Sequence, residues 1–107
     1  MKNKKMYNKL VRDKIPQIIR EDGKSCICHE ATGPTLKSYA KKKLIEEVNE
    51  FLQDPCVEEA ADVMEIFHFL CDLYDIRDSQ IMASSTAKRV TRGGFNKGTI
   101  LAWVNDE

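Results

Sequence analysis

Five of the seven acidic residues between positions 46 and 62 are the side chains of this sequence best suited to chemistry. An Asp-Pro break at residues 54–55 divides them, because proline lacks an N–H and restricts the residue before it. If the flanking segments form antiparallel helices, residues whose numbers sum to 109 lie at similar height, so Glu50 faces Glu59. By the same rule Glu47 faces Asp62, and acids three positions apart share one face of each helix.

Carboxylates that converge in this way repel one another unless a cation lies between them. Hard divalent cations prefer oxygen ligands, so the four facing acids predict a metal site, with Glu46 close by. The alternative interpretation is a solvated acidic helix face, which is the commoner use of such a run. The residues next to the acids help to decide between the two.

The segment at residues 57–74 is apolar on nearly every side of a helix. One apolar stripe consists of Val63, Ile66 and Leu70, and a second of Val57, Ala60, Ala61, Met64, Phe67 and Cys71. A helix with this pattern is expected to be buried. Ionised side chains are rarely buried without partners, so Glu59 and Asp62 in its first turns are expected to need a cation.

Length and composition favour one soluble domain over residues 1–107. Seventeen basic and seventeen acidic residues cancel, so no global charge favours a nucleic-acid polymer or an anionic membrane as partner. No apolar run approaches the roughly 20 residues of a membrane span. The charged start of the chain has no apolar region typical of a secretory signal, so we expect a cytoplasmic protein.

The four cysteines fall into two pairs. Cys56 and Cys71 fit the apolar helix pattern and are expected to be core residues in a reducing compartment. Cys26, Cys28 and His29 contain two types of zinc ligand, but their spacing is not that of common zinc sites. Their role stays open.

Apolar periodicity and helix-breaking residues predict four helices, which lie between Asp13 and Gly23, over residues 36–53, over residues 55–74 and over residues 80–92. We expect Asp13 to cap the first helix, Thr35 the second, and Asp78 or Ser79 the fourth. Residues 25–30 and 99–104 are β-like, and they could pair as a small two-stranded flank.

The predicted fold is therefore an all-α, antiparallel bundle of about four helices with at most that small β flank. Two helices with two apolar faces each leave surface that a chain of 107 residues does not easily cover. A second copy readily completes a four-helix core. We expect a homodimer, with a tetramer as the alternative.

Three motifs together give the chain a family resemblance. They are ExxE followed by ExxD in the acidic group, YNKLVRDKIP at residues 7–16, and RGGF at residues 92–95. With these motifs the sequence resembles a small stand-alone branch of the MazG-like, all-α nucleoside triphosphate pyrophosphohydrolases. The resemblance extends over nearly the whole chain.

The resemblance implies hydrolysis of nucleoside triphosphates between the α and β phosphates, giving a monophosphate and pyrophosphate, as a means of removing non-standard nucleotides. It implies Mg²⁺, with Mn²⁺ as a substitute, held by Glu47, Glu50, Glu59 and Asp62. Glu46 matches an additional acid of the family pattern that orients a ligand or a water. The family separates ExxE from ExxD by a dozen or more residues, whereas here only residues 51–58 intervene, which leaves less helix to enclose a nucleobase.

Further cations are needed to neutralise the departing pyrophosphate. The candidates are Lys9, Arg12 and Lys14 near the start of the chain and Lys88 and Arg92 near its end, although each is also explained as a solvated charge. Two other functions stay open: a helical regulatory or interaction module without catalysis, and hydrolysis of phosphoribosyl-ATP.

Overall fold

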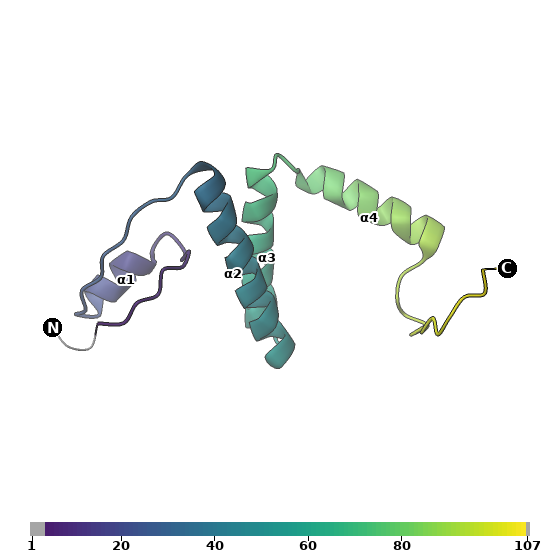
Figure 1. Ribbon diagram of the computed structural model, residues 1–107, viewed down its shortest axis with the longest axis horizontal. Coiled ribbons are helices and arrows are strands. Elements are labelled where there is room, and N and C mark those ends of the chain that lie inside the picture. Colours follow the sequence, from purple (N-terminus) through teal and green to yellow (C-terminus); the bar gives the residue numbers. More distant parts are fainter. Residues whose placement is uncertain (1–3, 107) are drawn as a thin grey trace. The chain divides into compact units, whose positions relative to one another are not determined.

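The computed structural model describes residues 4–106, which contain four α-helices and no β-strand. The helices are α1 (Ile15–Glu21), α2 (Gly33–Gln53), α3 (Val57–Leu73) and α4 (Asp78–Arg92), as labelled in Figure 1. The predicted all-α class and the predicted number of helices are therefore confirmed for this part of the chain.

Proline and glycine mark the helix boundaries. Pro16 and Pro34 lie in the first turns of α1 and α2, where a missing N–H leaves no hydrogen bond unmade. Gly23 follows α1 with φ of 82°, a conformation that most other residues avoid. Asp54 ends α2 immediately before Pro55, so the predicted break between the two acidic helices is confirmed.

The predicted capping residues were wrong. Lys14, rather than Asp13, occupies the N-cap position of α1 and makes no side-chain cap hydrogen bond. Thr35 lies inside α2, because the helix begins at Gly33, where the fixed φ of the following proline favours an early start.

At the start of α4 the N-cap position belongs to Arg77, so neither Asp78 nor Ser79 caps this helix. The Oε1 atom of Gln80 accepts a hydrogen bond of 2.9 Å from the backbone N–H of Arg77. The bond satisfies a donor that the helix itself leaves unpaired.

The β flank is absent, since residues 25–30 and 99–104 form no strand. Residues 25–30 instead contact α1. The thiol of Cys26 donates to the carbonyl of Pro16, with 3.9 Å between Sγ and oxygen, and Arg20 donates to the carbonyl of Cys26 over 3.5 Å. These contacts take the place of the predicted strand pairing.

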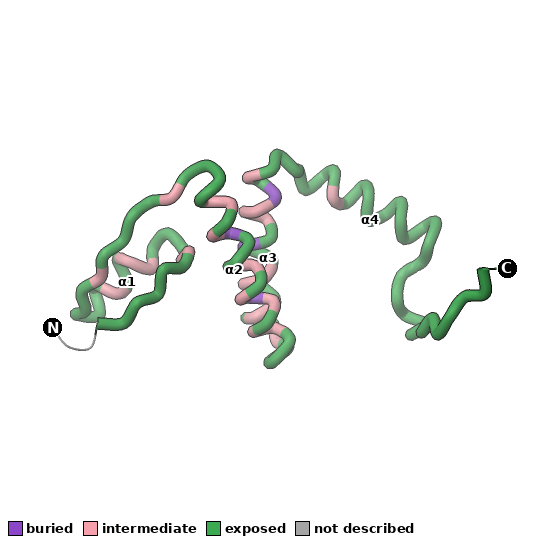
Figure 2. The backbone as a smooth tube through the Cα atoms, viewed as in Figure 1, coloured by how far each residue is buried: buried purple, intermediate pink, exposed green. Residues whose placement is uncertain are grey.

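The chain divides into two compact units, Met1–Asp75 and Ile76–Glu107, each of which is described by itself. In the first unit, α2 and α3 pack side by side as an antiparallel hairpin (Figure 1). Its small core contains Ala40, Ile66 and Cys71, which appear among the buried positions in Figure 2. The prediction of one domain over residues 1–107 stays a prediction.

The predicted burial of the helix at residues 57–74 on all sides was wrong. In α3 only Ile66 and Cys71 are buried, while Val57, Met64 and Phe67 are 80%, 55% and 40% exposed. The reason is that a single partner helix, α2, covers one face only. Cys71 lies in the core as predicted, whereas Cys56 is half-buried at the N-cap of α3.

Within residues 4–106, no helix has both the length and the apolar character that crossing a membrane requires.

Candidate functional site

The α2–α3 hairpin brings the five predicted acids together. Carboxylate oxygens of Glu46, Glu47 and Glu50, all from α2, lie within 4.8 Å of one another. Carboxylate oxygens of Glu47, Glu59 and Asp62 meet the same criterion across the two helices. Glu47 belongs to both groups, so it joins the two triads of acids into one cluster.

Glu47 is the buried charged residue of the described chain, with 8% of its surface exposed. Its Oε1 atom lies 3.3 Å from the Nζ atom of Lys43. Its Oε2 atom is also buried but has no hydrogen-bond partner within the described residues. An unsatisfied charged oxygen in this position is costly, and a bound cation is the ligand that would satisfy it.

Lys43 is the site residue that our sequence interpretation missed. Its Nζ atom lies 3.5 Å from Oε2 of Glu46 in addition to its contact with Glu47, and its side chain is only 15% exposed. The spacing of three and four residues from these two acids is the signal that could have identified it, because such positions are neighbours on a helix.

The segment before α1 brings two further cations to the acids. Nζ of Lys9 lies 3.2 Å from Oε2 of Glu46, and Nη2 of Arg12 lies 2.7 Å from Oδ1 of Asp62. Both residues were predicted to bind phosphate, and here they bind carboxylates. They therefore lie beside the predicted metal ligands, although they come from a distant part of the sequence.

The other three predicted phosphate ligands do not join this cluster within the first unit. Lys14 is exposed at the N-cap of α1. Lys88 and Arg92 are exposed residues of α4, which belongs to the second unit. Their roles stay predictions.

Electrostatic repulsion within the cluster shows in the pKa values of two acids. The charge of Glu47, followed by burial, raises the pKa of Glu50. Burial is the first cause that raises the pKa of Glu59, and the charges of Glu50 and Asp62 follow. Both shifts favour protonation, because at these two acids the effects of burial and of neighbouring negative charge outweigh those of positive charge.

Glu46 behaves in the opposite way. Burial alone would raise the pKa of Glu46, but hydrogen bonds and the positive charges of Lys9 and Lys43 together outweigh it, so the pKa is lowered. The resident lysines therefore neutralise one side of the cluster, and the side formed by Glu50 and Glu59 is left with excess negative charge.

A cavity of about 210 Å³ opens beside the cluster, and Arg12, Lys43, Glu47 and Asp62 are among its lining residues. Pockets that enclose most of a drug-sized ligand are typically about 300–1,000 Å³ in volume. The cavity is therefore smaller than a typical pocket for a complete nucleotide.

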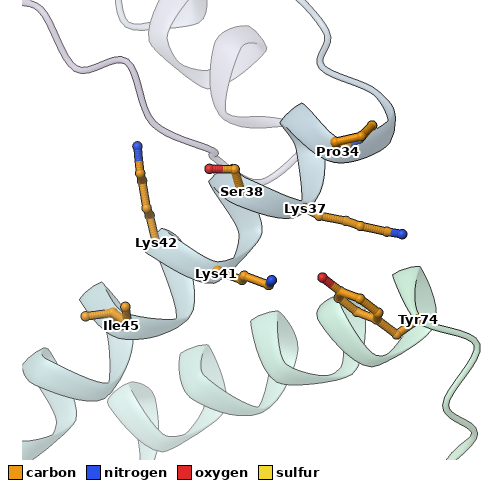
Figure 3. Close-up of a pocket in the computed structure, with 7 residues that line it drawn as sticks. All are labelled: Pro34, Lys37, Ser38, Lys41, Lys42, Ile45 and Tyr74. Carbon is orange, nitrogen blue, oxygen red and sulfur yellow. The ribbon is translucent and has the colours of Figure 1, made fainter.

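A second pocket, of about 360 Å³, lies along the N-terminal half of α2 (Figure 3). Its lining contains Lys37, Lys41, Lys42 and Tyr74 and no acid. The lining of this pocket therefore contains no carboxylate, whereas that of the smaller cavity includes Glu47 and Asp62.

The zinc interpretation gains no support from the described residues. Cys26, Cys28 and His29 form no group of three converging metal ligands there. Burial and the neighbouring Cys26 raise the pKa of Cys28, which disfavours the thiolate form that binds zinc.

Comparisons of this chain with models of protein families, with curated proteins and with solved structures gave no match. The resemblance to the MazG-like hydrolases therefore rests on the three sequence motifs alone and stays a prediction.

Replacing Lys43 by Met is expected to lower the free energy of unfolding in metal-free buffer by about 2–3 kcal/mol, because it leaves Glu47 buried without its cation. Breaking a fully buried ion pair typically costs about 3–5 kcal/mol. The loss expected here is smaller, because the side chains of Lys43 and Glu47 are still 15% and 11% exposed. Urea unfolding in EDTA measures it. Lys42→Met, at an exposed position of the same helix, should stay within about 0.5 kcal/mol of the wild type, and equal losses would contradict the assignment.

Without metal, the contribution of Glu50 and Glu59 to stability is expected to fall as the pH rises above their ordinary value of 4.5. The folded chain binds more protons at these groups than the unfolded chain, so each rise in pH through the raised pKa values favours unfolding. The lowered pKa of Glu46 acts only below 4.5, where it removes stability as the pH falls.

The double variant Glu50→Gln/Glu59→Gln should therefore lose less stability than the wild type between about pH 4.5 and 7, as measured by urea unfolding at a series of pH values. Glu58→Gln/Asp72→Asn removes two exposed acids from α3 and serves as the control with equal charge change. If the two double variants follow the same pH profile, the repulsion assigned to the cluster is not there.

Proposed function

We propose that this protein is a Mg²⁺-dependent nucleoside triphosphate pyrophosphohydrolase of the MazG-like type. The observation that carries the proposal is the buried Glu47 carboxylate, which belongs to both triads of acids and whose Oε2 atom has no hydrogen-bond partner within residues 4–106. Cationic side chains beside the triads complete a site with the charges that a metal–triphosphate complex needs.

The carboxylates have distinct roles in this proposal. Glu47, Glu50, Glu59 and Asp62 would hold the metal, and Glu46 would orient a ligand or the attacking water. Mg²⁺, or Mn²⁺ in its place, would supply charge against the phosphate oxygens and lower the pKa of water. In the reaction, the water oxygen bonds to the α phosphorus and the water gives up a proton to solvent or to a nearby carboxylate. The bond between the α phosphorus and the α–β bridging oxygen breaks, and pyrophosphate leaves with that oxygen.

Lys9 and Arg12 are suited to receive the phosphates. Each forms an ion pair with an acid of the cluster, and each is partly exposed. When a cation neutralises those acids, the ammonium and guanidinium groups become available to phosphate oxygens, which bind charged donors strongly. Lys14, Lys88 and Arg92 are proposed as further phosphate ligands.

The substrate class that we propose is the non-standard nucleoside triphosphates, handled in the cytoplasm. The cavity of about 210 Å³ beside the acids is small for a whole nucleotide. Arg12 and Lys43 in its lining would contact the phosphates, and Glu47 and Asp62 would contact them through the metal ion. All such substrates share the phosphate groups. The base would lie outside the cavity.

Activity is tested with a panel of normal and damaged nucleoside triphosphates and Mg²⁺, with pyrophosphate and orthophosphate measured separately. We expect pyrophosphate as the product. Glu47→Gln and Asp62→Asn should each reduce the rate by at least about 100-fold, because each removes a ligand from the triad that spans the two helices. Circular dichroism confirms that the variants are folded.

Glu58→Gln is the matched control, since Glu58 precedes Glu59 on α3 but belongs to neither triad. It should keep nearly the full rate. Absence of turnover on every nucleotide, together with a melting temperature that Mg²⁺ does not change, would favour a non-catalytic interaction module.

We also propose that the protein is a homodimer in which a second copy covers the exposed apolar stripe of α3. Val57, Ala60, Met64 and Phe67 lie at helical spacing along this stripe and are all exposed in one chain. Large contiguous apolar surfaces of this kind are typical of interfaces. Two copies of the α2–α3 hairpin would form a four-helix core.

Met64→Glu should convert the dimer into a monomer, because it places a charge in the centre of this stripe, and sedimentation velocity measures the change. Ile27→Glu introduces the same charge at a 95% exposed residue outside the stripe and should leave the dimer intact. A wild-type protein that sediments as a monomer at all concentrations contradicts the proposal.

A further inference from the structure

A pocket on α2, the lysine pocket, is lined by three lysines and no acid. Lys37, Lys41 and Lys42 line it, together with Ser38 and with Tyr74, which follows α3. Figure 3 shows Lys37 and Lys41 extending toward the ring of Tyr74, while Lys42 points away from it. The volume of the pocket is about 360 Å³.

The three lysines of this pocket lack acidic partners. Within residues 4–106, ion pairs of α2 involve Lys43 and not Lys37, Lys41 or Lys42. Aromatic rings are their neighbours instead: Nζ of Lys37 and of Lys41 lie 4.7 and 5.4 Å from the centre of the Tyr74 ring. A ring face attracts a cation but does not neutralise its charge.

The position of these lysines also works against the helix that carries them. Like charges four residues apart on a helix repel each other. Lys37 and Lys41 are such a pair, and the first turn of α2 contains no acid that could offset their charge. The arrangement is therefore not explained by the stability of α2.

The C-terminal end of α3 offers one structural explanation for the lysines. Tyr74 is the C-cap residue of α3, and its ring lies 4.7 and 5.4 Å from Nζ of Lys37 and of Lys41, so these lysines lie at the negative end of α3. The partial charge at the end of a helix is only about half a unit. It leaves most of the charge of three ammonium groups without a counter-charge.

We propose that this pocket is a second binding site, which takes an anion with two linked phosphate groups. The ammonium groups of Lys37 and Lys41 flank the pocket and would each contact one phosphate, with Lys42 and the hydroxyl of Ser38 at its edge. The shared chemistry is the diphosphate group, which free pyrophosphate and the tail of a nucleoside diphosphate both provide. The site does not depend on the proposed hydrolase activity.

Tyr74 supplies an internal reporter for this site. Hydrogen bonding to Lys41 is the main cause that lowers the pKa of the Tyr74 hydroxyl, against a smaller opposing effect of burial. An anion that binds the same lysines adds negative charge next to the hydroxyl, so binding should raise the pKa of Tyr74. Tyrosinate absorbance measures the change, and Tyr74→Phe removes it.

The test is calorimetric titration of the full chain with pyrophosphate and, separately, with ADP, in EDTA and at low ionic strength. Without divalent metal, the acidic cluster repels both ligands. The variant Lys37→Gln/Lys41→Gln should bind about tenfold more weakly than the wild type, because it loses two partly exposed ion pairs with phosphate. Lys24→Gln/Lys97→Gln makes the same change in net charge outside the pocket and should bind like the wild type.

Tighter binding of pyrophosphate than of ADP identifies the free anion as the ligand, and the reverse order identifies a nucleotide. The proposal is overturned if the wild type binds neither ligand, or if both double variants bind equally. It is also overturned if Lys37→Gln/Lys41→Gln lowers the melting temperature but leaves anion binding unchanged, since the lysines then serve the end of α3. Each of these results is independent of catalysis, because the titrations contain no metal.

Discussion

The site depends on the burial of one carboxylate between two helices. Glu47 is 8% exposed, and the hairpin places it where it meets acids of both helices. Lys43 satisfies one of its oxygens, and the other has no partner within the described residues. Because an isolated charge is costly away from water, this position is stable only with positive charge supplied by side chains or by an ion.

The gathering of acids at the hairpin could be predicted from the sequence, because a short break between two periodic helices fixes which residues face each other. Glu47 and Asp62 meet across the helices as that register requires, whereas Glu50 groups with acids of its own helix. Lys43, the residue that the sequence interpretation missed, neutralises charge at the site. Lysines are common on helix surfaces, so a single lysine carries little information until its partners are known.

The caps and the surroundings of α3 were less predictable. A helix start depends on competing local choices, and the Gly-Pro pair at residues 33–34 overrode Thr35. The apolar pattern of α3 was correctly recognised, but the pattern shows only that its faces avoid water. It does not show whether the same chain or another molecule covers them, and in one chain α2 covers a single face.

The connection between α2 and α3 has a consequence for the order in which the site assembles. The two helices are joined by only three residues, whereas Arg12 reaches Asp62 across fifty positions of sequence. Local contacts form sooner than distant ones, because closing a long loop costs more chain entropy. The acids are therefore expected to meet before the N-terminal cations arrive, so the hairpin first gathers its negative charges without two of the side chains that later offset them.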